Sequence, residues 1–221
     1  MGPSIVMNIN PTRFFLMRHA ETSVPGVFHG AESDIGLSDR GIEQAKAAAR
    51  FFKTQKPTRL ISSGMLRALT TASEIASTCN LEVEVFVDLH ERKVGTLSGT
   101  VNNLPDGPWR QTLSRWLNGE TSFAPGGSES LDQMLARILP IWNEITRKYQ
   151  GETVVIVAHG AVLKVLLLTI LKEWCIADWD KFGVIPNVGI TELVFDQHWK
   201  SIRLNEVPQD APEPAGFVLN G

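Results

Sequence analysis

The chain has 221 residues, of which 43% are hydrophobic and 20% are charged, and its formal net charge is −3. These proportions are typical of soluble globular proteins and exclude a wholly disordered chain, a collagen-like repeat and a disulfide scaffold. A chain of this length buries roughly 70% of its unfolded surface, so its core needs no disulfide or metal. The slightly acidic balance predicts no nucleic-acid or membrane partner, and an anionic ligand would therefore require local cationic side chains.

Three features bear on the compartment of the protein. Cys79 and Cys175 lie far apart without CxxC spacing, which indicates free thiols in a reducing environment. The N-terminus lacks the basic and apolar regions of a secretory signal. The longest apolar stretch, residues 153–171, contains a histidine, a glycine and a lysine and fits a buried strand and helix better than a membrane span. We therefore expect a cytoplasmic protein.

Short apolar runs alternate with helical patterns along the chain. Strands are predicted at Arg13–Met17, Arg59–Ser62, Val83–Val87, Thr153–Ala158 and Thr191–Phe195. Helices are predicted at Ser38–Lys53, Met65–Ser77, Ser130–Tyr149 and Val162–Lys172. The third helix begins with a capping box of Ser130 and Gln133, and Pro140 is expected to bend it. The alternation predicts an α/β fold with a mostly parallel sheet and helices on both faces.

No repeat or long linker divides the chain, so we expect a single domain over residues 1–208 and a flexible, proline-rich tail at 209–221. A small insertion at about 98–126 interrupts the alternation and is expected to hold a short helix. It contains Trp109, Arg110, Arg115 and Trp116. This insertion is either a lid over a site or a surface excursion whose tryptophans pack onto the body. The sequence leaves the oligomeric state open.

Candidate functional residues follow three of the predicted strands. Arg18 and His19 follow the first, Arg67 lies on the first turns of the helix after the second, and His159 and Gly160 follow the fourth. The carboxyl ends of parallel strands open onto one crevice, so these groups are expected to meet there. Two arginine forks and a helix N-terminus suit a phosphate or a carboxylate. Each residue alone has a structural alternative, such as a packed histidine, but their coincidence favours a site.

Phosphoryl transfer is the chemistry that such a set fits. One neutral imidazole would attack phosphorus, while the arginines and the other imidazole stabilise charge on the equatorial oxygens. Glu91 is a candidate proton donor for the leaving alkoxide, since a phosphate dianion beside it favours its protonated form. The alternative for Glu91 is a solvated carboxylate paired with Arg92 or Lys93. The motifs of nucleotide-binding, serine-hydrolase and zinc-protease sites are absent, and the five histidines lack metal-ligand spacing.

In order along the chain, these segments resemble the histidine phosphatase superfamily, the phosphoglycerate mutase-like proteins. The resemblance rests on FLMRHAET at 15–22, on Gly30, Leu37, Gly41, Gln44 and Ala45, on SGMLRALTTA at 63–72, on ERKVGTL at 91–97, on PGGSES at 125–130 and on AHG at 158–160. Six ordered matches over residues 13 to about 195 are far more specific than any single one.

The resemblance implies a doubly wound α/β fold and a catalytic cycle that needs neither a metal nor an organic cofactor. His19 would become the phosphohistidine, and Arg18, Arg67 and His159 would bind the phosphoryl group. Glu91 would be the proton donor and later the base. A small phosphorylated substrate, and the phosphate ion released from it, are the ligands that this family membership implies.

Further predicted substrate-binding residues are Thr22, His29, Gly30, Arg92 and Gly160. The chain also departs from the family pattern, since Gly127-Ser128-Glu129 holds one residue more than the usual turn and two single positions differ. Ala20 replaces the usual glycine, and Pro25 stands where many members place a phosphate-contacting asparagine. Thr22 and His29 are the candidate substitutes for that asparagine.

A phosphomonoesterase acting on a small phosphorylated metabolite is the leading interpretation of the function. His159 follows Glu91 by only 68 positions, whereas mutases of the family carry a longer insertion there. The alternatives are a phosphoglycerate-type phosphomutase and a catalytically silent phosphate-binding module, the latter disfavoured by the complete set of site residues. The arginines of the 98–126 insertion indicate a second anionic group on the substrate, and its tryptophans equally indicate a ring.

Overall fold

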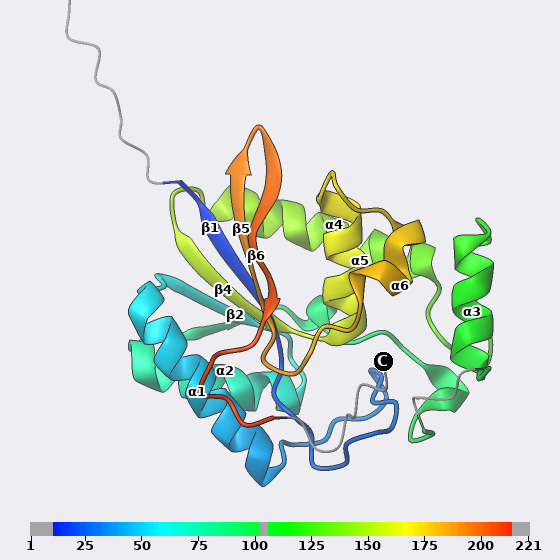
Figure 1. The fold of residues 1–221 in the computed structure, drawn as a ribbon, viewed down its shortest axis with the longest axis horizontal. Coiled ribbons are helices and arrows are strands. Elements are labelled where there is room, and N and C mark those ends of the chain that lie inside the picture. Colours follow the sequence, from blue (N-terminus) through cyan, green and yellow to red (C-terminus); the bar gives the residue numbers. More distant parts are fainter. Residues whose placement is uncertain (1–10, 102–105, 214–221) are drawn as a thin grey trace, which may run out of the picture.

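A six-stranded sheet forms the centre of the computed structural model, which describes residues 11–101 and 106–213 (Figure 1). The strands are β1 (Arg13–Arg18), β2 (Arg59–Ser62), β3 (Val83–Val85), β4 (Thr153–Ala158), β5 (Ile190–Asp196) and β6 (His198–Glu206). Their order is β3-β2-β4-β1-β5-β6. The first four strands of this order are parallel to one another, and β5 pairs antiparallel with both β1 and β6. The predicted α/β fold with a mostly parallel sheet is confirmed.

Helices connect the strands. They are α1 (Asp39–Gln55), α2 (Leu66–Cys79), α3 (Pro108–Leu117), α4 (Leu131–Lys148), α5 (Gly160–Ile170) and α6 (Trp179–Phe182), with short 3-10 turns η1 (Val87–Leu89), η2 (Gly95–Leu97) and η3 (Ile176–Asp178). The side chain of Ser38 accepts a hydrogen bond from the backbone N–H of Gly41 and so begins α1. Both hydrogen bonds of the predicted capping box, Ser130 with Gln133, are present at the start of α4, and this helix continues through Pro140.

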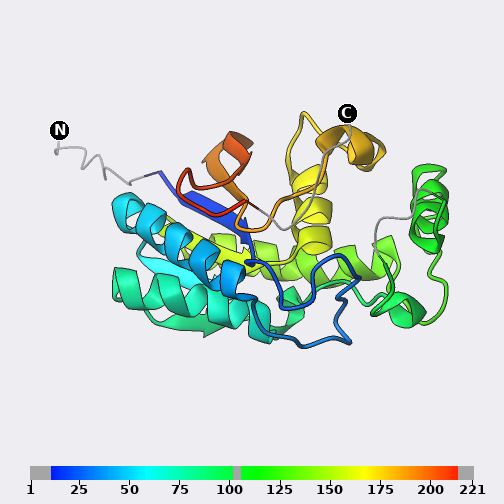
Figure 2. The same cartoon turned by 60° about the horizontal axis from the view of Figure 1, so that its bottom comes forward.

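The strands supply side chains to two hydrophobic cores, one on each face of the sheet. Phe14 and Leu16 of β1 pack in the core with α4 and α5, whereas Phe15 and Met17 pack with α1 and α2. Figure 2 shows α1 and α2 together on one side of the sheet. Because successive strand residues point to opposite faces, a strand buried on both sides must be apolar throughout. This requirement explains the continuous apolar runs from which the parallel strands were predicted.

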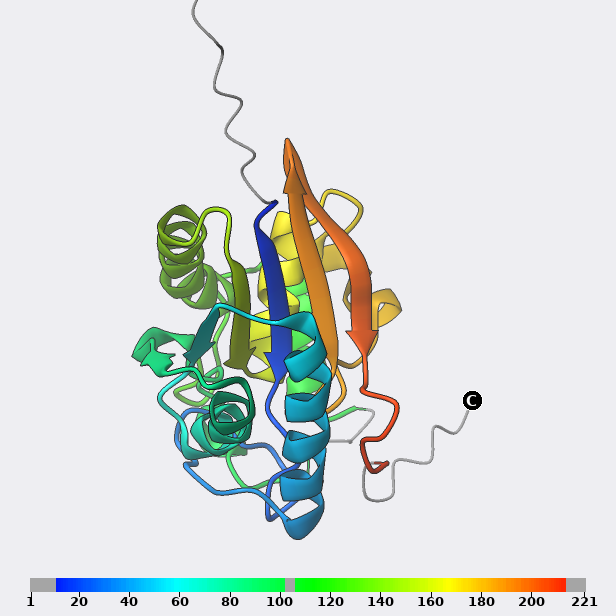
Figure 3. The ribbon, with the colours of Figure 1, turned by 90° about the vertical axis from the view of Figure 1, so that its left-hand side faces the viewer.

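Only β2 and β4 have their predicted bounds, and the other predicted strands and helices differ by one or two residues at one or both ends. β3 ends at Val85 rather than Val87, because the chain turns there into η1. Helix α5 begins at Gly160, two residues earlier than predicted. Strand β6 was not predicted, since its sequence HWKSIRLNE mixes charged and apolar residues on a half-exposed edge strand. It pairs with β5 in a hairpin at the edge of the sheet (Figure 3).

Helix α3 lies within the predicted insertion, of which residues 102–105 are outside the described part of the chain. Trp116 is only 2% exposed, and Trp109 packs against both Trp116 and Trp179 of α6, with ring centroids 5.5 and 5.6 Å apart. Arg110 pairs with Asp180 at 2.7 Å and so joins α3 to α6. The tryptophans therefore pack onto the body, as the second interpretation of the insertion expected.

The start of the predicted tail contacts α1. Asp210 pairs with Arg50 at 2.6 Å, and the carbonyl of Pro212 accepts a hydrogen bond from the side chain of Gln44. Residues 214–221 of this predicted tail and residues 1–10 lie outside the described residues. Both cysteines are free, as expected. No helix within the described ranges is long and apolar enough to cross a membrane.

Candidate active site

The carboxyl ends of β1, β2 and β4 meet at one edge of the sheet and bring two histidines together. The backbone N–H of His19 donates to the carbonyl of Ala158 at 2.9 Å, and that of Ser63 donates to the carbonyl of Val157 at 3.1 Å. The rings of His19 and His159 consequently lie with their centroids 5.1 Å apart. Both side chains are buried, at 5% and 0% exposure.

His19 is held as a neutral imidazole with one free nitrogen. Its Nδ1 lies 2.7 Å from the carbonyl oxygen of Ala20 and, because a carbonyl only accepts, Nδ1 carries the proton. The other nitrogen, Nε2, therefore has its lone pair available. Burial, followed by the positive charges of Arg67 and Arg18, holds the pKa of His19 well below its usual range. This is the protonation state that a nucleophile requires.

The two predicted arginines are held by carbonyl oxygens. Arg18 donates from Nη1 to the carbonyl of Ile185 at 2.8 Å. Arg67, which is fully buried, donates to the carbonyls of Ser33 and His29 at 2.7 and 3.1 Å. Carbonyl groups fix the position of a guanidinium group without neutralising its charge, so both arginines remain cationic ligands for an anion.

The charges of Arg18 and Arg67 have no close counterion in the described part of the chain, where no carboxylate lies within 4 Å of either. Each also keeps a buried Nε without a hydrogen-bond partner. Burial lowers the pKa of both groups, and the more distant carboxylate of Glu91 partly opposes that effect. A phosphate dianion would supply both the missing charge and the missing acceptors.

His159 is positioned by a residue to which the sequence assigned no role. Its Nε2 lies 2.6 Å from the hydroxyl oxygen of Ser63, while its buried Nδ1 has no partner. Burial and the neighbouring His19 and Arg67 hold the pKa of His159 well below its usual range. Ser63 opens the SGMLRALTTA segment that carries part of the family resemblance, so its place in that motif was the available signal.

The carboxylate of Glu91 lies at the N-terminus of α5. Its Oε1 accepts hydrogen bonds from the backbone N–H groups of Arg92 and Val162 at 2.8 and 3.3 Å, and its Oε2 accepts one from Ala161 at 3.2 Å. The unpaired N–H groups of a helix N-terminus suit a carboxylate. Since α5 begins directly after His159, these bonds place Glu91 beside the histidine pair.

A loop after α6 completes the site, and no motif in the sequence predicts it there. The carbonyl of Ile185 in this loop accepts the hydrogen bond from Arg18, and Asn187 donates from Nδ2 to the carbonyl of His19 at 3.0 Å. Lys164 of α5 holds the start of this loop by donating to the carbonyl of Gly183 at 2.6 Å, with its Nζ 4.4 Å from the ring centroid of Trp179. Burial lowers the pKa of Lys164 to about 8.

Two of the predicted substrate-binding residues are glycines at close approaches. A Cβ added at Gly160 would lie 3.4 Å from Nε of Arg18, which is the side of that guanidinium without a partner. A Cβ at Gly30 would lie 2.8 Å from the carbonyl oxygen of Arg92, and the carbonyl of Gly30 itself faces Arg67 at 3.4 Å. Both positions therefore keep the backbone close to the cationic groups of the site.

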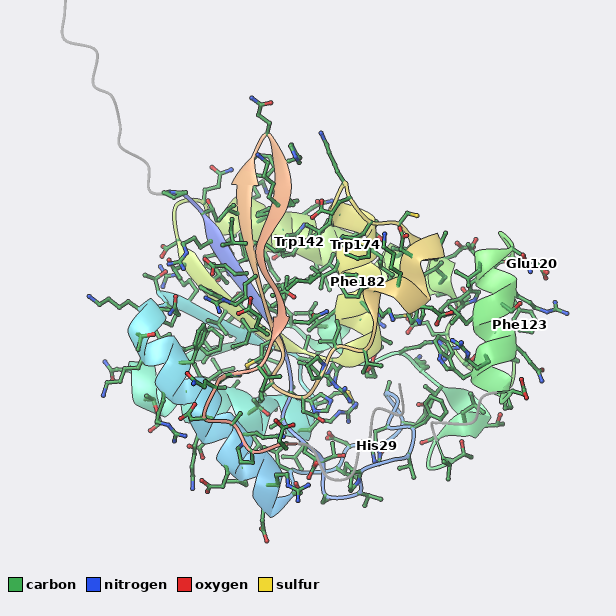
Figure 4. All side chains as sticks on the ribbon, viewed as in Figure 1. His29, Glu120, Phe123, Trp142, Trp174 and Phe182 are labelled. Atoms are coloured by element: carbon green, nitrogen blue, oxygen red, sulfur yellow. The ribbon has the colours of Figure 1, made fainter. Side chains whose placement is uncertain are left out.

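The side chains of His29 and Thr22 form hydrogen bonds within the loop that carries them. The Nε2 of His29 donates to the carbonyl of Val24 at 2.6 Å, and its Nδ1 lies 3.0 Å from the hydroxyl of Ser33. Figure 4 labels His29 on the loop that follows β1. The Thr22 hydroxyl, in a residue only 6% exposed, lies 3.5 Å from the same Val24 carbonyl. Neither side chain has a free donor aimed at a ligand unless this loop rearranges.

The remaining predicted arginines are engaged elsewhere. Arg92 is 2% exposed, donates from Nε to the carbonyl of Glu129 at 2.9 Å and lies over Trp109 and Trp116. Arg92 therefore braces the base of the insertion. The exposed Arg115 and Arg110 of α3 form surface ion pairs with Glu120 and Asp180. Among the described residues, no group of three or more His, Cys, Asp or Glu side chains could hold a metal ion.

The two buried histidines predict that the fold loses stability on acidification. Because the pKa of each is below the value of about 6.5 in an unfolded chain, the unfolded state binds protons that the folded state does not. The histidines' contribution to the free energy of unfolding is then fully present above about pH 7 and falls below that pH, by up to about 1.4 kcal/mol per pH unit for each histidine.

The measurement is the melting temperature from pH 8 to pH 5. It should fall less steeply with pH for His159→Gln than for wild type. An unchanged slope in His159→Gln would contradict the prediction.

The family model of the histidine phosphatase superfamily (branch 1) matches residues 14–207. A metal-independent phosphoserine phosphatase from Arabidopsis thaliana is 32% identical to the chain over 218 residues, covering 84% of this chain and 88% of the relative. A glucosyl-3-phosphoglycerate phosphatase from Mycobacterium tuberculosis is 30% identical and covers 85% of this chain and 86% of the relative. Among solved structures, a phosphoserine phosphatase mutant from Entamoeba histolytica in complex with phosphoserine has a TM-score of 0.77 at 27% identity, covering 90% of this chain and 98% of its own.

Proposed function

The chain belongs to the histidine phosphatase superfamily and is a phosphoric monoester hydrolase, and we propose that it hydrolyses small phosphorylated carboxylic acids, such as phosphoserine, through a phosphohistidine on His19. The observation that carries this proposal is the state of His19. Its Nδ1 is committed to the carbonyl of Ala20, its Nε2 is free, and two guanidinium groups without close counterions lie beside it. A nucleophile and a phosphate-binding cradle therefore occupy the same crevice.

In the proposed reaction, Arg18, Arg67 and His159 bind the phosphoryl group. Nε2 of His19 attacks phosphorus in line, the bond from phosphorus to the ester oxygen breaks, and protonated Glu91 donates its proton to the leaving alkoxide. Water then attacks phosphorus, the bond from phosphorus to Nε2 of His19 breaks, and the Glu91 carboxylate takes up one proton of that water. Inorganic phosphate leaves, with His19 and Glu91 returned to their starting states. The N–H groups at the start of α5 stabilise Glu91 during the interval in which it is a carboxylate.

The substrate class is supported by the relatives rather than by a pocket of this chain. The phosphoserine phosphatase and the glucosyl-3-phosphoglycerate phosphatase both act on phosphate esters that carry a carboxylate, and the related Entamoeba enzyme is complexed with phosphoserine. In this chain the arginines of α3 are paired at the surface, so the cationic groups placed to meet an anionic substrate are those of the strand-end crevice.

The test is phosphate release in EDTA from phosphoserine, 3-phosphoglycerate and phosphoethanolamine, which lacks the carboxylate. We expect release that is unaffected by the chelator, with a kcat/KM about tenfold lower or more for phosphoethanolamine. Equal kcat/KM values for the three substrates would show that the enzyme does not recognise the substrate carboxylate. Migration of phosphate between positions of phosphoglycerate without release would identify a mutase, and phosphate binding without any turnover would identify a silent module.

A further inference from the structure

We propose that Arg137, acting through Glu129, is a positioning residue that holds Glu91 in place for proton transfer to the leaving group. This inference rests on the proposed function, in which Glu91 is the proton donor. Neither Arg137 nor Glu129 touches the histidine pair. Their contacts connect helix α4 to the segment that carries Glu91.

The two side chains form a buried, bidentate ion pair. Arg137 of α4 donates from Nε to Oε1 of Glu129 at 2.9 Å and from Nη2 to Oε2 at 2.7 Å. Their side chains are only 12% and 9% exposed. The fork geometry and the burial make this pair a rigid connection, unlike the exposed ion pairs elsewhere on the surface.

The remaining polar groups of the pair bind the segment on both sides of Glu91. Nη1 of Arg137 donates to the carbonyls of Asp88 and of His90, the latter at 3.1 Å. The carboxylate of Glu129 accepts from the backbone N–H of Lys93 at 3.3 Å, and its own backbone N–H donates to the carbonyl of Lys93 at 2.9 Å. The carbonyl of Glu129 also accepts the Nε bond of Arg92 described above.

The backbone of Glu91 itself has one local partner and one weak partner, because its carbonyl faces Nδ1 of the adjacent His90 at 2.7 Å. Residues 90–94 belong to neither a helix nor a strand, and the backbone N–H of Glu91 faces the sulfur of Met65 at 3.5 Å. Sulfur is a weak acceptor. The ion pair therefore fixes this segment relative to α5, whose N–H groups receive the Glu91 carboxylate, together with the bonds from the N–H of Ala31 to the carbonyl of Arg92 and from the N–H of Val94 to Glu32.

Only an arginine can make all of these bonds at once. A lysine at position 137 could still reach the Glu129 carboxylate, but a single ammonium cannot also span the two carbonyls. Loss of those two bonds should let the segment move and should weaken proton donation more than it weakens phosphate binding. The effect should therefore depend on the basicity of the leaving group.

The experiment compares phenyl phosphate with 4-nitrophenyl phosphate, which are similar in shape but differ in their need for a proton on departure. We expect Arg137→Lys to lower kcat/KM for phenyl phosphate about tenfold more than for 4-nitrophenyl phosphate, and Glu91→Gln to produce a larger difference in the same direction. In the double variant, the difference should equal that of Glu91→Gln alone, because both changes act on one proton transfer. Arg147→Lys, on the exposed side of the same helix, should change neither substrate.

Equal losses for both phosphates in Arg137→Lys, while Glu91→Gln discriminates between them, would overturn the positioning role and leave the proposed function intact. No discrimination in Glu91→Gln would overturn the acid assignment and the positioning role together. If Arg137→Lys does not yield folded protein by circular dichroism, Glu129→Gln is measured instead. It keeps the shape of the side chain but loses the charge, and it should discriminate in the same direction.

Discussion

Replacing His19 by alanine is expected to lower kcat by about 10⁴-fold or more, since the variant has no atom on which the phosphoenzyme can form. The structure leaves only one free nitrogen on this ring and places it beside the two guanidinium groups. The same substitution should eliminate the acid-labile phosphate label that the wild-type protein retains when it is denatured during turnover. Steady-state phosphate release and the trapped label are the two measurements.

The control for this experiment is His198→Ala, at the start of β6 on the far edge strand. It should keep wild-type turnover and wild-type labelling. Turnover that persists in His19→Ala would show that another residue is the nucleophile. The neighbouring imidazole of His159 would then be the first candidate. A label that persists while turnover is lost would show that a residue other than His19 carries the phosphoryl group.

The strand-end residues could be predicted because the physical requirement for a parallel sheet is local. Strands β1, β2 and β4 are buried on both faces, so each is a continuous apolar run, and the polar residue that follows marks its end. The family match over residues 14–207 confirms the resemblance that rests on those segments. Strand β6 has no such signal, since an edge strand with one exposed face tolerates charged residues.

What the sequence could not supply is the set of contacts between distant segments. Asn187 and the carbonyl of Ile185 reach the site through a loop with no motif, and a backbone carbonyl has no sequence signature at all. Arg92 is a second example. It is one of the predicted substrate-binding residues, and the contacts that its side chain makes in the structure, with the carbonyl of Glu129 and over Trp109 and Trp116, have no signal in the sequence.

Burial accounts for both halves of the site's electrostatics. It keeps His19 and His159 neutral, which preserves a nucleophile in the presence of two arginines. It also leaves Arg67 fully buried and Arg18 partly buried, with carbonyl groups as their hydrogen-bond partners. In the proposed function, a bound phosphate dianion would supply the opposite charge and the acceptors that these two arginines lack.

Arg67→Met is the substitution that tests most directly whether the buried guanidinium of Arg67 binds the phosphate dianion. We expect kcat/KM to fall by roughly 10²–10³-fold, because a buried donor that stabilises transition-state charge is lost. In the wild type, inorganic phosphate at 100 times its Kd should raise stability by about 2.7 kcal/mol, and in Arg67→Met most of that increase should disappear. Arg50→Met, which removes an exposed ion pair from α1, should retain the full increase. If phosphate stabilises Arg67→Met as much as it stabilises the wild type, the dianion does not bind to this guanidinium, and other groups must form the phosphate-binding site.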